Sequence, residues 1–400
     1  MHIAFFTPLP PIQSALADFA EGLIDALATL PEVLALDVFT SGTYTPETDF
    51  SNDRIGVFPH TVYPSRQQDY DVTVYSLGDN GRFHGYMLDY VHRFPGVVIL
   101  NDTTLHRCIL TATVGQNNPQ AYIDELIYAY QDDAAHIAQQ ISSGLGNEVL
   151  LRFPLIERII DSSQGVIVQN QFAQRQVLGL RPFAHTKIIP YPYFLPKELA
   201  TKNPTAIRTE QRTALGFTPD SFLVGSFGIF VPNKHLRACL AAFKEATNHE
   251  PTAHYLLGGF AADGYDLADE IRHMGLEDQV HMTGWQPPAT FVRQMFALDV
   301  GIHLRHPHIG GTPYTPIRLM GLGIATITSD IEPLQELPQG TCIKVTPDDY
   351  AEALLVELLS KLAADTTLRQ LIAENGRTFI QQNHQLKEIA QQYLQFFQNL

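Results

Sequence analysis

The stretch FLVGSFGIFVPNKHLRACLAAF, residues 222–243, decides the fold class of this chain. It begins with a mainly apolar run, Phe222–Phe227, in which Ser226 is the one polar residue, and Gly228 follows directly. Apolar residues then recur at helical spacing from Leu236 to Phe243. A buried strand, a glycine turn and a helix in this order predict a βαβ unit and therefore a parallel sheet.

The same alternation of apolar runs and helical patterns extends along the whole chain. Ser14 is the predicted N-cap of the first helix. Three prolines within residues 188–196 interrupt the pattern, which predicts a boundary near residue 200 between two α/β domains in series. The expected strands are His2–Phe6, Val33–Phe39, Val72–Tyr75, Val97–Leu100, Val166–Val168, Phe222–Phe227, Tyr255–Leu257, Val280–Met282, Val300–Leu304 and Ala325–Thr328.

Length and charge exclude several classes of protein. The 400 residues suggest two domains. The 26 basic and 42 acidic residues give a net charge of −16, which argues against a nucleic-acid-binding protein. The sequence has no run of 18 apolar residues, so no integral membrane segment is expected, and no leader-like segment precedes His2. Three widely spaced cysteines are typical of reduced thiols, so a cytoplasmic location is expected.

Two segments carry the residue types of a phosphate site. Lys234 follows the glycine turn after the strand Phe222–Phe227, where backbone N–H groups and a helix N-terminus favour an anion. Arg305 and Arg318 flank the glycine-containing loop within residues 304–323 and could neutralise a diphosphate. The alternatives are a simple tight turn at the first segment and a surface loop with solvated arginines at the second.

Polar residues after the strands and a group of histidines are further candidates for a functional site. Asp102 and His106 follow a strand end, where ligands bind in open α/β sheets, and could orient an acceptor hydroxyl. The alternatives are a helix N-cap for Asp102 and a surface position for His106. His84 is another cleft candidate, with structural burial as its alternative. The histidines near residues 303–308 do not converge at strand spacing, so no metal site is expected.

In this order the segments resemble the GT-B-fold glycosyltransferases of family 4, the retaining, metal-independent group. Phe6–Phe19 looks like the family's first strand, loop and helix, and Gly228–Lys234 looks like its donor-diphosphate turn. His281–Gln286 looks like the loop facing the nucleobase, and Arg318–Gly323 looks like the helix of its glutamate motif. The implied α/β fold has two Rossmann-like domains facing across a cleft, residues 1–195 and 196–384, with a C-terminal helix, 385–400, crossing back to the first domain.

The resemblance implies a hexosyltransferase that moves a sugar from a nucleotide-sugar to a hydroxyl acceptor, with neither a metal nor a cofactor. The residues expected to take part in catalysis are Asp102, Lys234 and Arg305. Those expected to bind the donor are Gly228, Lys234, Trp285, Gln286, Gly310, Gly311, Thr312 and Arg318. Those expected on the acceptor side are Ser14, Ala15, His84 and His106.

One departure from the family pattern keeps a second function open. The family's two motif glutamates, eight positions apart, are replaced here by Gly310 and Arg318. Arginine cannot accept a hydrogen bond, so it cannot replace a carboxylate that does. The alternative is an inactive partner or stabilising subunit of an active glycosyltransferase, and a homo-oligomer is also compatible with the sequence. A nucleotide-sugar epimerase is a weaker alternative, because no paired acid and base groups are found.

Overall fold

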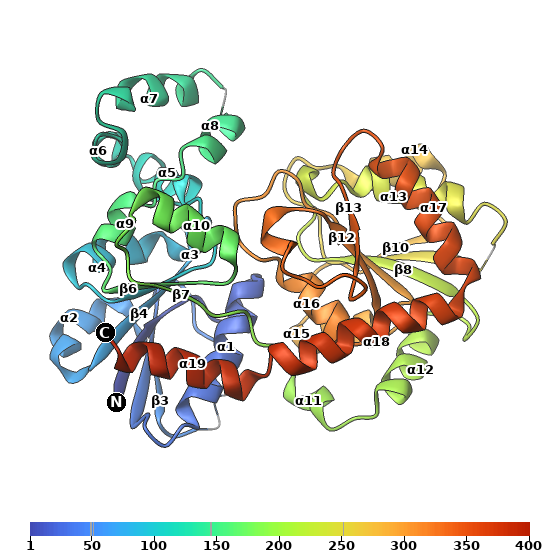
Figure 1. Ribbon diagram of the computed structural model, residues 1–400, viewed down its shortest axis with the longest axis horizontal. Helices are drawn as coiled ribbons and strands as arrows, with labels where there is room; N and C mark the ends of the chain where they lie inside the picture. The colour runs from blue at the N-terminus through green and yellow to red at the C-terminus, as the bar shows by residue number, and fades with distance from the viewer. Residues whose placement is uncertain (49, 51, 145, 251) are drawn as a thin grey trace. The chain divides into compact units, whose positions relative to one another are not determined.

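The computed structural model describes residues 1–48, 50, 52–144, 146–250 and 252–400. The chain forms two compact units, each built on a parallel sheet (Figure 1). The first unit contains Met1–Pro192, Ile309–Thr312 and Leu386–Leu400. The second contains Tyr193–His308 and Pro313–Gln385.

The first unit has a seven-stranded sheet in the order β3-β2-β1-β4-β5-β6-β7, with every neighbouring pair parallel. Its strands are β1 (His2–Phe6), β2 (Ala35–Thr40), β3 (Ile55–Pro59), β4 (Val72–Leu77), β5 (Val97–Leu100), β6 (Gly165–Val168) and β7 (Thr186–Ile188). Its helices are α1 (Ala15–Ala28), α2 (Tyr63–Arg66), α3 (Gly81–His84), α4 (Leu88–Arg93), α5 (His106–Thr113), α6 (Pro119–Tyr130), α7 (Ala134–Ser142), α8 (Gly146–Arg152), α9 (Glu157–Asp161), α10 (Gln171–Leu180) and α19 (Leu386–Gln398).

Helices α1 and α19 show how the first unit covers its sheet. Ser14 caps α1 as predicted, because its side chain accepts a hydrogen bond from the backbone N–H of Leu16. The last helix, α19, packs against α1 with its apolar stripe buried. The ring of Phe396 lies against Gly165, where a Cβ would come within 2.7 Å of it, so glycine at the start of β6 makes room for this ring.

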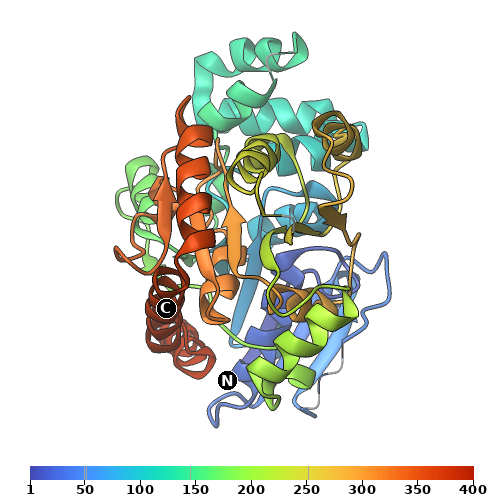
Figure 2. The same cartoon turned by 90° about the vertical axis from the view of Figure 1, so that its right-hand side faces the viewer.

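The second unit has a six-stranded parallel sheet in the order β10-β9-β8-β11-β12-β13, with an apolar cluster on each of its faces. Helices cover both faces (Figure 2). Its strands are β8 (Phe222–Phe227), β9 (Ala253–Gly258), β10 (Val280–Met282), β11 (Val300–His303), β12 (Ala325–Ser329) and β13 (Ile343–Val345). Its helices are α11 (Lys197–Ala200), α12 (Pro204–Ala214), α13 (Leu236–Ala246), α14 (Leu267–Met274), α15 (Pro288–Met295), α16 (Tyr314–Gly321), α17 (Ala351–Ala364) and α18 (Thr366–Asn383).

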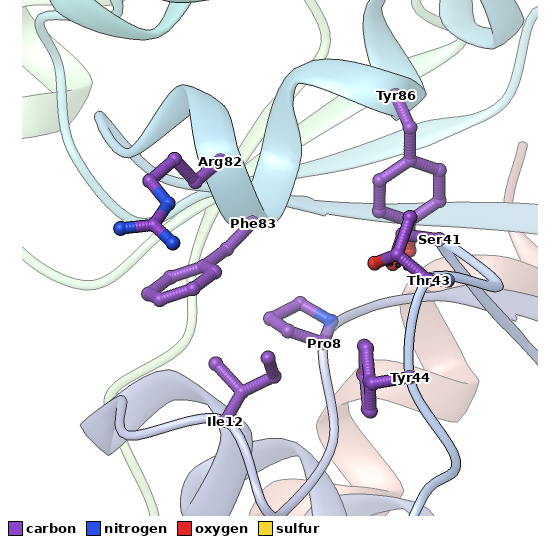
Figure 3. Close-up of a pocket in the computed structure, with 8 residues that line it drawn as sticks. All are labelled: Pro8, Ile12, Ser41, Thr43, Tyr44, Arg82, Phe83 and Tyr86. Carbon is purple, nitrogen blue, oxygen red and sulfur yellow. Dashed lines mark hydrogen bonds between the residues drawn. The ribbon is translucent and has the colours of Figure 1, made fainter.

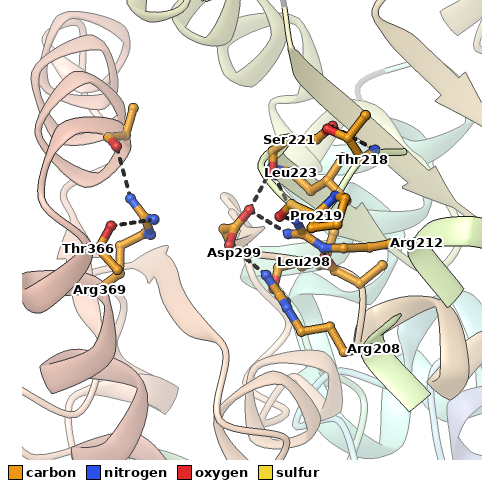
Figure 4. Close-up of polar contacts among 12 residues, drawn as sticks. Arg208, Arg212, Thr218, Pro219, Ser221, Leu223, Leu298, Asp299, Thr366 and Arg369 are labelled. Carbon is orange, nitrogen blue, oxygen red and sulfur yellow. Dashed lines mark hydrogen bonds and ion pairs between the residues drawn. The ribbon is translucent and has the colours of Figure 1, made fainter. Parts of the chain in front are cut away.

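An ion network around the buried Arg212 fixes α12 at the start of the second unit's central strands (Figure 4). Asp299, directly before β11, accepts hydrogen bonds from the guanidinium groups of Arg208 and Arg212 on α12, each at 2.7 Å. Its carboxylate also accepts from the backbone N–H of Leu223 at 2.8 Å. The side chain of Arg212 is only 6% exposed, so its charge depends on Asp299 for compensation.

The α/β class and the two parallel sheets predicted from the sequence are confirmed. The prediction missed β3, β7 and β13, and all three are edge strands of their sheets. Edge strands are only partly buried here, so they lack the continuous apolar run that marks a central strand. The segment Ile309–Thr312 was expected in the second domain, but its contacts place it in the first unit.

Candidate active site

Three basic side chains gather in the second unit where the loops after β8 and β11 meet. Lys234 lies in the loop after β8, His303 is the last residue of β11, and Arg305 follows it. We call these three residues the basic cluster. Strands β8 and β11 are neighbours in the sheet. From β8 the later strands β9 and β10 follow on one side, and from β11 the strands β12 and β13 follow on the other, so the strand order reverses between β8 and β11. In open α/β sheets this switch point is where ligands bind, outside the carboxyl ends of the strands.

The glycine turn places the Lys234 ammonium group over the end of β8. Its Nζ donates a hydrogen bond to the carbonyl oxygen of Phe227 at 3.3 Å. Gly228 has a φ of +110°, and a Cβ there would come within 2.9 Å of Nζ. Glycine is therefore required at position 228 by the backbone conformation, and it leaves room for the lysine. The lysine belongs to a 3-10 turn, Pro232–Lys234, that precedes α13.

The two loops are tied together by hydrogen bonds that hold the basic cluster in place. The backbone N–H of His306 donates to the carbonyl oxygen of Asn233 at 2.8 Å, and the Asn233 amide donates to the carbonyl oxygen of Pro307 at 3.0 Å. The backbone N–H of Arg305 donates to Ser329 Oγ at 2.8 Å. Lys234 and Arg305 therefore sit on loops fixed to each other.

The electrostatics of the basic cluster favour a bound anion. Burial, followed by the positive charge of Arg305, lowers the pKa of Lys234 to about 7. Burial, then the charges of Lys234 and Arg305, lowers the pKa of His303 well below its ordinary value. The His303 side chain is buried, and in the described part of the chain its Nε2 has no hydrogen-bond partner. An anion placed here would offset the repulsion between the Lys234 and Arg305 charges, and it would accept a hydrogen bond from Nε2 in the His303 tautomer that carries its proton there.

The neighbouring histidines do not join this cluster. His306 lies beside His235, with ring centroids 6.5 Å apart, and His308 Nε2 bonds Glu332 at 2.8 Å. Across the described residues, no group of three or more metal-ligating side chains is found.

The other residues expected to bind the donor lie after the edge strand β10 and on helix α16. Trp285 and Gln286 follow β10, the edge strand that is separated from β8 by β9. Trp285 is 43% exposed, and the Gln286 amide donates to the Thr283 carbonyl oxygen at 2.8 Å. Arg318 is buried in α16, with its guanidinium carbon 4.6 Å from the centre of the Tyr314 ring. This cation–π contact holds Arg318 against its own helix.

In the first unit, Asp102 and His84 converge beside Gly78, at the carboxyl end of β4. A Cβ on Gly78 would lie 3.2 Å from Asp102 Oδ2 and 3.3 Å from His84 Nε2. The carbonyl oxygen of Ser76 accepts a hydrogen bond from His84 Nδ1 at 2.9 Å, so Nε2 is the acceptor nitrogen. Burial lowers the pKa of His84 to about 4, which keeps the ring neutral near pH 7.

Asp79, which the sequence pattern did not single out, is a buried carboxyl next to Asp102. Its backbone N–H donates to Asp102 Oδ2 at 2.9 Å, and its own Oδ1 accepts from the backbone N–H of Cys108 at 3.0 Å. Burial, followed by the charge of Asp102, raises the pKa of Asp79 to about 7. Asp79 therefore holds both the first turn of α5 and the side chain of Asp102.

The segment Ile309–Thr312 rests on the same edge of the first unit. Its two glycines, Gly310 and Gly311, permit close approach: a Cβ on Gly310 would lie 1.8 Å from Thr103 Oγ1, and one on Gly311 would lie 2.7 Å from Asp102 Oδ1. The backbone N–H of Thr103 donates to the Ile309 carbonyl oxygen at 2.9 Å. The structure thus brings together Asp102 and the three predicted residues at positions 310–312.

Asn170 also holds this segment. Its side-chain amide donates to the carbonyl oxygen of Gly310 at 3.1 Å and to Thr312 Oγ1 at 2.9 Å. The preceding residue, Gln169, is buried at the end of β6, and its amide atoms have no hydrogen-bond partner within the described ranges. Only the position of these two residues after a strand could have drawn attention to them in the sequence.

The other acceptor-side candidates differ from one another. Ser14 and Ala15 start α1, and the next side chain, Leu16, reaches to 2.9 Å from a Cβ placed on Gly78. His106 is fully buried rather than at the surface. Its two ring nitrogens bond the carbonyl oxygen of Phe153 and the hydroxyl of Tyr122. Both nitrogens are therefore engaged inside the first unit.

The N-cap alternative for Asp102 is not observed. The N-cap of α5 is Leu105. The Asp102 carboxylate instead accepts the backbone N–H of Asp79 and lies next to His84.

Replacing Gly310 by alanine is expected to detach the segment Ile309–Thr312 from the first unit. Its φ of +82° disfavours any side chain, and the added Cβ would overlap Thr103 Oγ1. A matched control is Gly144→Ala, because Gly144 has a φ of +90° with nothing within 4 Å. The control should cost about 1–2 kcal/mol of unfolding free energy, the usual cost of a left-handed residue.

Hydrogen exchange separates the two effects. The Thr103 amide, bonded to the Ile309 carbonyl oxygen, should exchange faster in Gly310→Ala and unchanged in Gly144→Ala. Equal exchange rates for that amide in the two variants would show that the contact between Gly310 and Thr103 tolerates a side chain.

Comparisons with known proteins agree with this architecture. Residues 207–379 match the family of glycosyl transferases group 1. The chain is similar to Anabaena Alr3699/HepE solved in complex with UDP-glucose, at 18% identity and a TM-score of 0.69 over all of both chains. It is also similar to sucrose-phosphate synthase from Thermosynechococcus elongatus, at 16% identity and a TM-score of 0.68 over 100% of this chain and 99% of that one.

A third similar structure is WaaG, a glycosyltransferase involved in lipopolysaccharide biosynthesis, at 14% identity and a TM-score of 0.65 over 98% of both chains. A search of curated proteins gave no match. None of the helices in the described ranges has the length and apolar character needed to cross a membrane. The chain therefore has the GT-B fold, and its residues 207–379 match glycosyl transferases group 1.

Proposed function

We propose that this chain transfers a hexose from a nucleotide-sugar to a hydroxyl acceptor, with retention at the anomeric carbon and without a metal. The observation that carries the proposal is the basic cluster of Lys234, His303 and Arg305 at the switch point of the second sheet. A diphosphate is the anion of a nucleotide-sugar that fits such a cluster. UDP and UDP-glucose, bound in the HepE structures, are the first ligands to try.

The basic cluster would act on the leaving group. As the bond between the anomeric carbon and the diphosphate oxygen breaks, negative charge grows on the diphosphate, and Lys234 and Arg305 stabilise it. The acceptor oxygen bonds to the anomeric carbon on the same face of the ring, and its proton passes to an oxygen of the departing diphosphate. The chain then needs to place the acceptor rather than deprotonate it.

The first unit would supply that placement. Asp102 and the neutral ring of His84, which converge beside Gly78, can accept hydrogen bonds from an acceptor hydroxyl. On the donor side, Trp285 and Gln286 would contact the nucleobase, and residues 310–312 would contact the transferred sugar. Arg318 would add a positive charge from α16.

Nucleotide binding tests the proposal. UDP, GDP and ADP, each free and as its glucose ester, are compared by thermal unfolding of the full chain. A ligand that binds only the folded state adds about 2.7 kcal/mol at a concentration 100-fold above its Kd. One nucleotide series should raise the midpoint, and its sugar ester should then support transfer or slow hydrolysis. No rise with any nucleotide would contradict the proposal.

A second candidate function rests on the position of Gly310. The family's first motif glutamate is absent, and the seat of Gly310 against Thr103 has no space for a side chain. This observation favours a non-catalytic partner of another glycosyltransferase. Nucleotide binding without transfer or hydrolysis of any sugar ester would support that function instead.

Donor affinity should depend on pH through Lys234. Its pKa of about 7 in the free protein means that the neutral amine dominates above pH 7. A bound diphosphate favours the charged ammonium form and raises that pKa, so binding takes up a proton. Affinity for UDP-glucose should therefore fall as pH rises from 7 to 9, by up to about tenfold per unit.

Calorimetry measures this proton uptake directly. UDP-glucose is titrated at pH 8 in two buffers with different ionisation enthalpies, because its diphosphate, esterified at both ends, does not titrate near neutral pH. The heat should differ between the buffers for the parent protein and agree for Lys234→Gln. Equal heats for the parent would show that Lys234 is already charged before the ligand binds.

A further inference from the structure

A pocket of about 280 Å³ lies at the carboxyl edge of the first unit's sheet, and its residues have no role in the site described so far (Figure 3). Its walls come from the segments after β1, β2 and β4, which are adjacent strands. The lining residues are Pro8, Ile12, Ser41, Thr43, Tyr44, Arg82, Phe83 and Tyr86.

Part of the pocket wall is aromatic, and hydrogen bonds to backbone hold two of its rings in place. The hydroxyl of Tyr44 accepts the backbone N–H of Leu9 at 2.8 Å, and the hydroxyl of Tyr86 donates to the Phe39 carbonyl oxygen at 2.9 Å. Both hydroxyls are thus bonded to backbone, which fixes the two rings as walls. The ring of Phe83 faces the same space from α3 (Figure 3). Fixed aromatic walls lower the entropy cost of binding.

The polar groups of the pocket lie beside these walls. Ser41 Oγ and Thr43 Oγ1 are 2.8 Å apart, and Arg82 adds an exposed guanidinium. Apolar faces combined with a few hydroxyl groups match a pyranose, whose C–H faces are apolar and whose hydroxyls point outward. The volume is just below the usual range of about 300–1,000 Å³ for small-molecule sites, which suits one ring better than a lipid chain.

The pocket shares helix α3 with the group formed by Asp102 and His84. Helix α3 carries Phe83 into the pocket and His84, the next residue, to the side of Gly78. The short helix α3 therefore links the wall of the pocket to one of the groups proposed to orient the acceptor hydroxyl.

We propose that this pocket binds a monosaccharide unit of the acceptor, so that the acceptor is itself a glycoside rather than a lipid alcohol or a simple phosphate. That the bound sugar is part of the acceptor rests on the proposed function. The binding of a sugar ring in this pocket is a separate property of the first unit.

Ligand-detected saturation-transfer NMR on the full chain tests the inference. The probes are methyl pyranosides of glucose, galactose, mannose and N-acetylglucosamine, with n-octanol and methyl phosphate as the contrasting probes. At least one methyl pyranoside should show transfer to its ring protons. Phe83→Ala should weaken its binding by about tenfold, as expected for loss of a central aromatic contact. Phe183→Ala is the matched control, because Phe183 is fully exposed.

Thr43→Val is the second variant, because it removes a rim hydroxyl without emptying a wall, and it should also weaken the glycoside signal. The inference is overturned if no methyl pyranoside binds, if Phe83→Ala and Thr43→Val both bind like the parent, or if only n-octanol or methyl phosphate depends on Phe83. These probes need no donor. If no nucleotide binds, the proposed function is contradicted, but the binding of methyl pyranosides can still be measured and still tests the pocket.

Discussion

Replacing Lys234 by alanine is expected to reduce the rate of sugar transfer by about 10²–10³-fold, the loss seen when one electrostatic contact to developing charge is removed. The ammonium group lies at the end of β8 with the charge of Arg305 nearby, so the variant leaves the departing diphosphate with one cation fewer. The measurement is the initial rate with the nucleotide-sugar selected by the binding panel, together with the Kd of the nucleotide.

Arg237→Ala is the control for this prediction. Arg237 is an exposed cation on α13, three residues after Lys234, and its removal should leave the rate within about twofold, because exposed charges contribute little. The unfolding midpoint of unliganded Lys234→Ala should lie at or above that of the parent, since burial disfavours the ammonium form. A rate unchanged by Lys234→Ala would remove the basic cluster from the mechanism.

The basic cluster could be predicted in part because its signals are local. A strand, a glycine and a lysine within residues 222–234 define the turn, and strand parity places His303 and Arg305 on one face. The role of His303 was missed. Burial of its ring and the unmatched Nε2 depend on how β11 packs between β8 and β12, which sequence spacing does not report.

Long-range contacts explain what could not be predicted in the first unit. Thr103 bonds Ile309 and Asn170 bonds Gly310 from positions more than 100 residues away in the chain, so no window of sequence contains these contacts. His106 illustrates the reverse case. A polar residue after a strand suggests the surface, but a carbonyl oxygen and the Tyr122 hydroxyl satisfy its ring inside the core.

Replacing Asp299 by alanine is expected to lower the free energy of unfolding of the second unit by about 3–5 kcal/mol, the usual cost of leaving a buried charge without its partner. Arg212 is buried and bonds the Asp299 carboxylate at 2.7 Å, and the backbone N–H of Leu223 loses its acceptor as well. The measurement is urea unfolding followed by the fluorescence of Trp285, the single tryptophan of the chain, which lies in the second unit.

Two further variants show whether the loss comes from the uncompensated charge. Glu374→Ala breaks an ion pair of the same 2.7 Å length with Arg377, but both side chains are well exposed, so the expected loss is at most about 1 kcal/mol. Adding Arg212→Leu to Asp299→Ala removes the buried charge and should recover part of the stability, because an apolar replacement of a buried pair is often tolerated. If the double variant were less stable than Asp299→Ala alone, the network would act through its hydrogen bonds to the carbonyl oxygens of Ala297, Pro219 and Ser221 rather than through charge compensation.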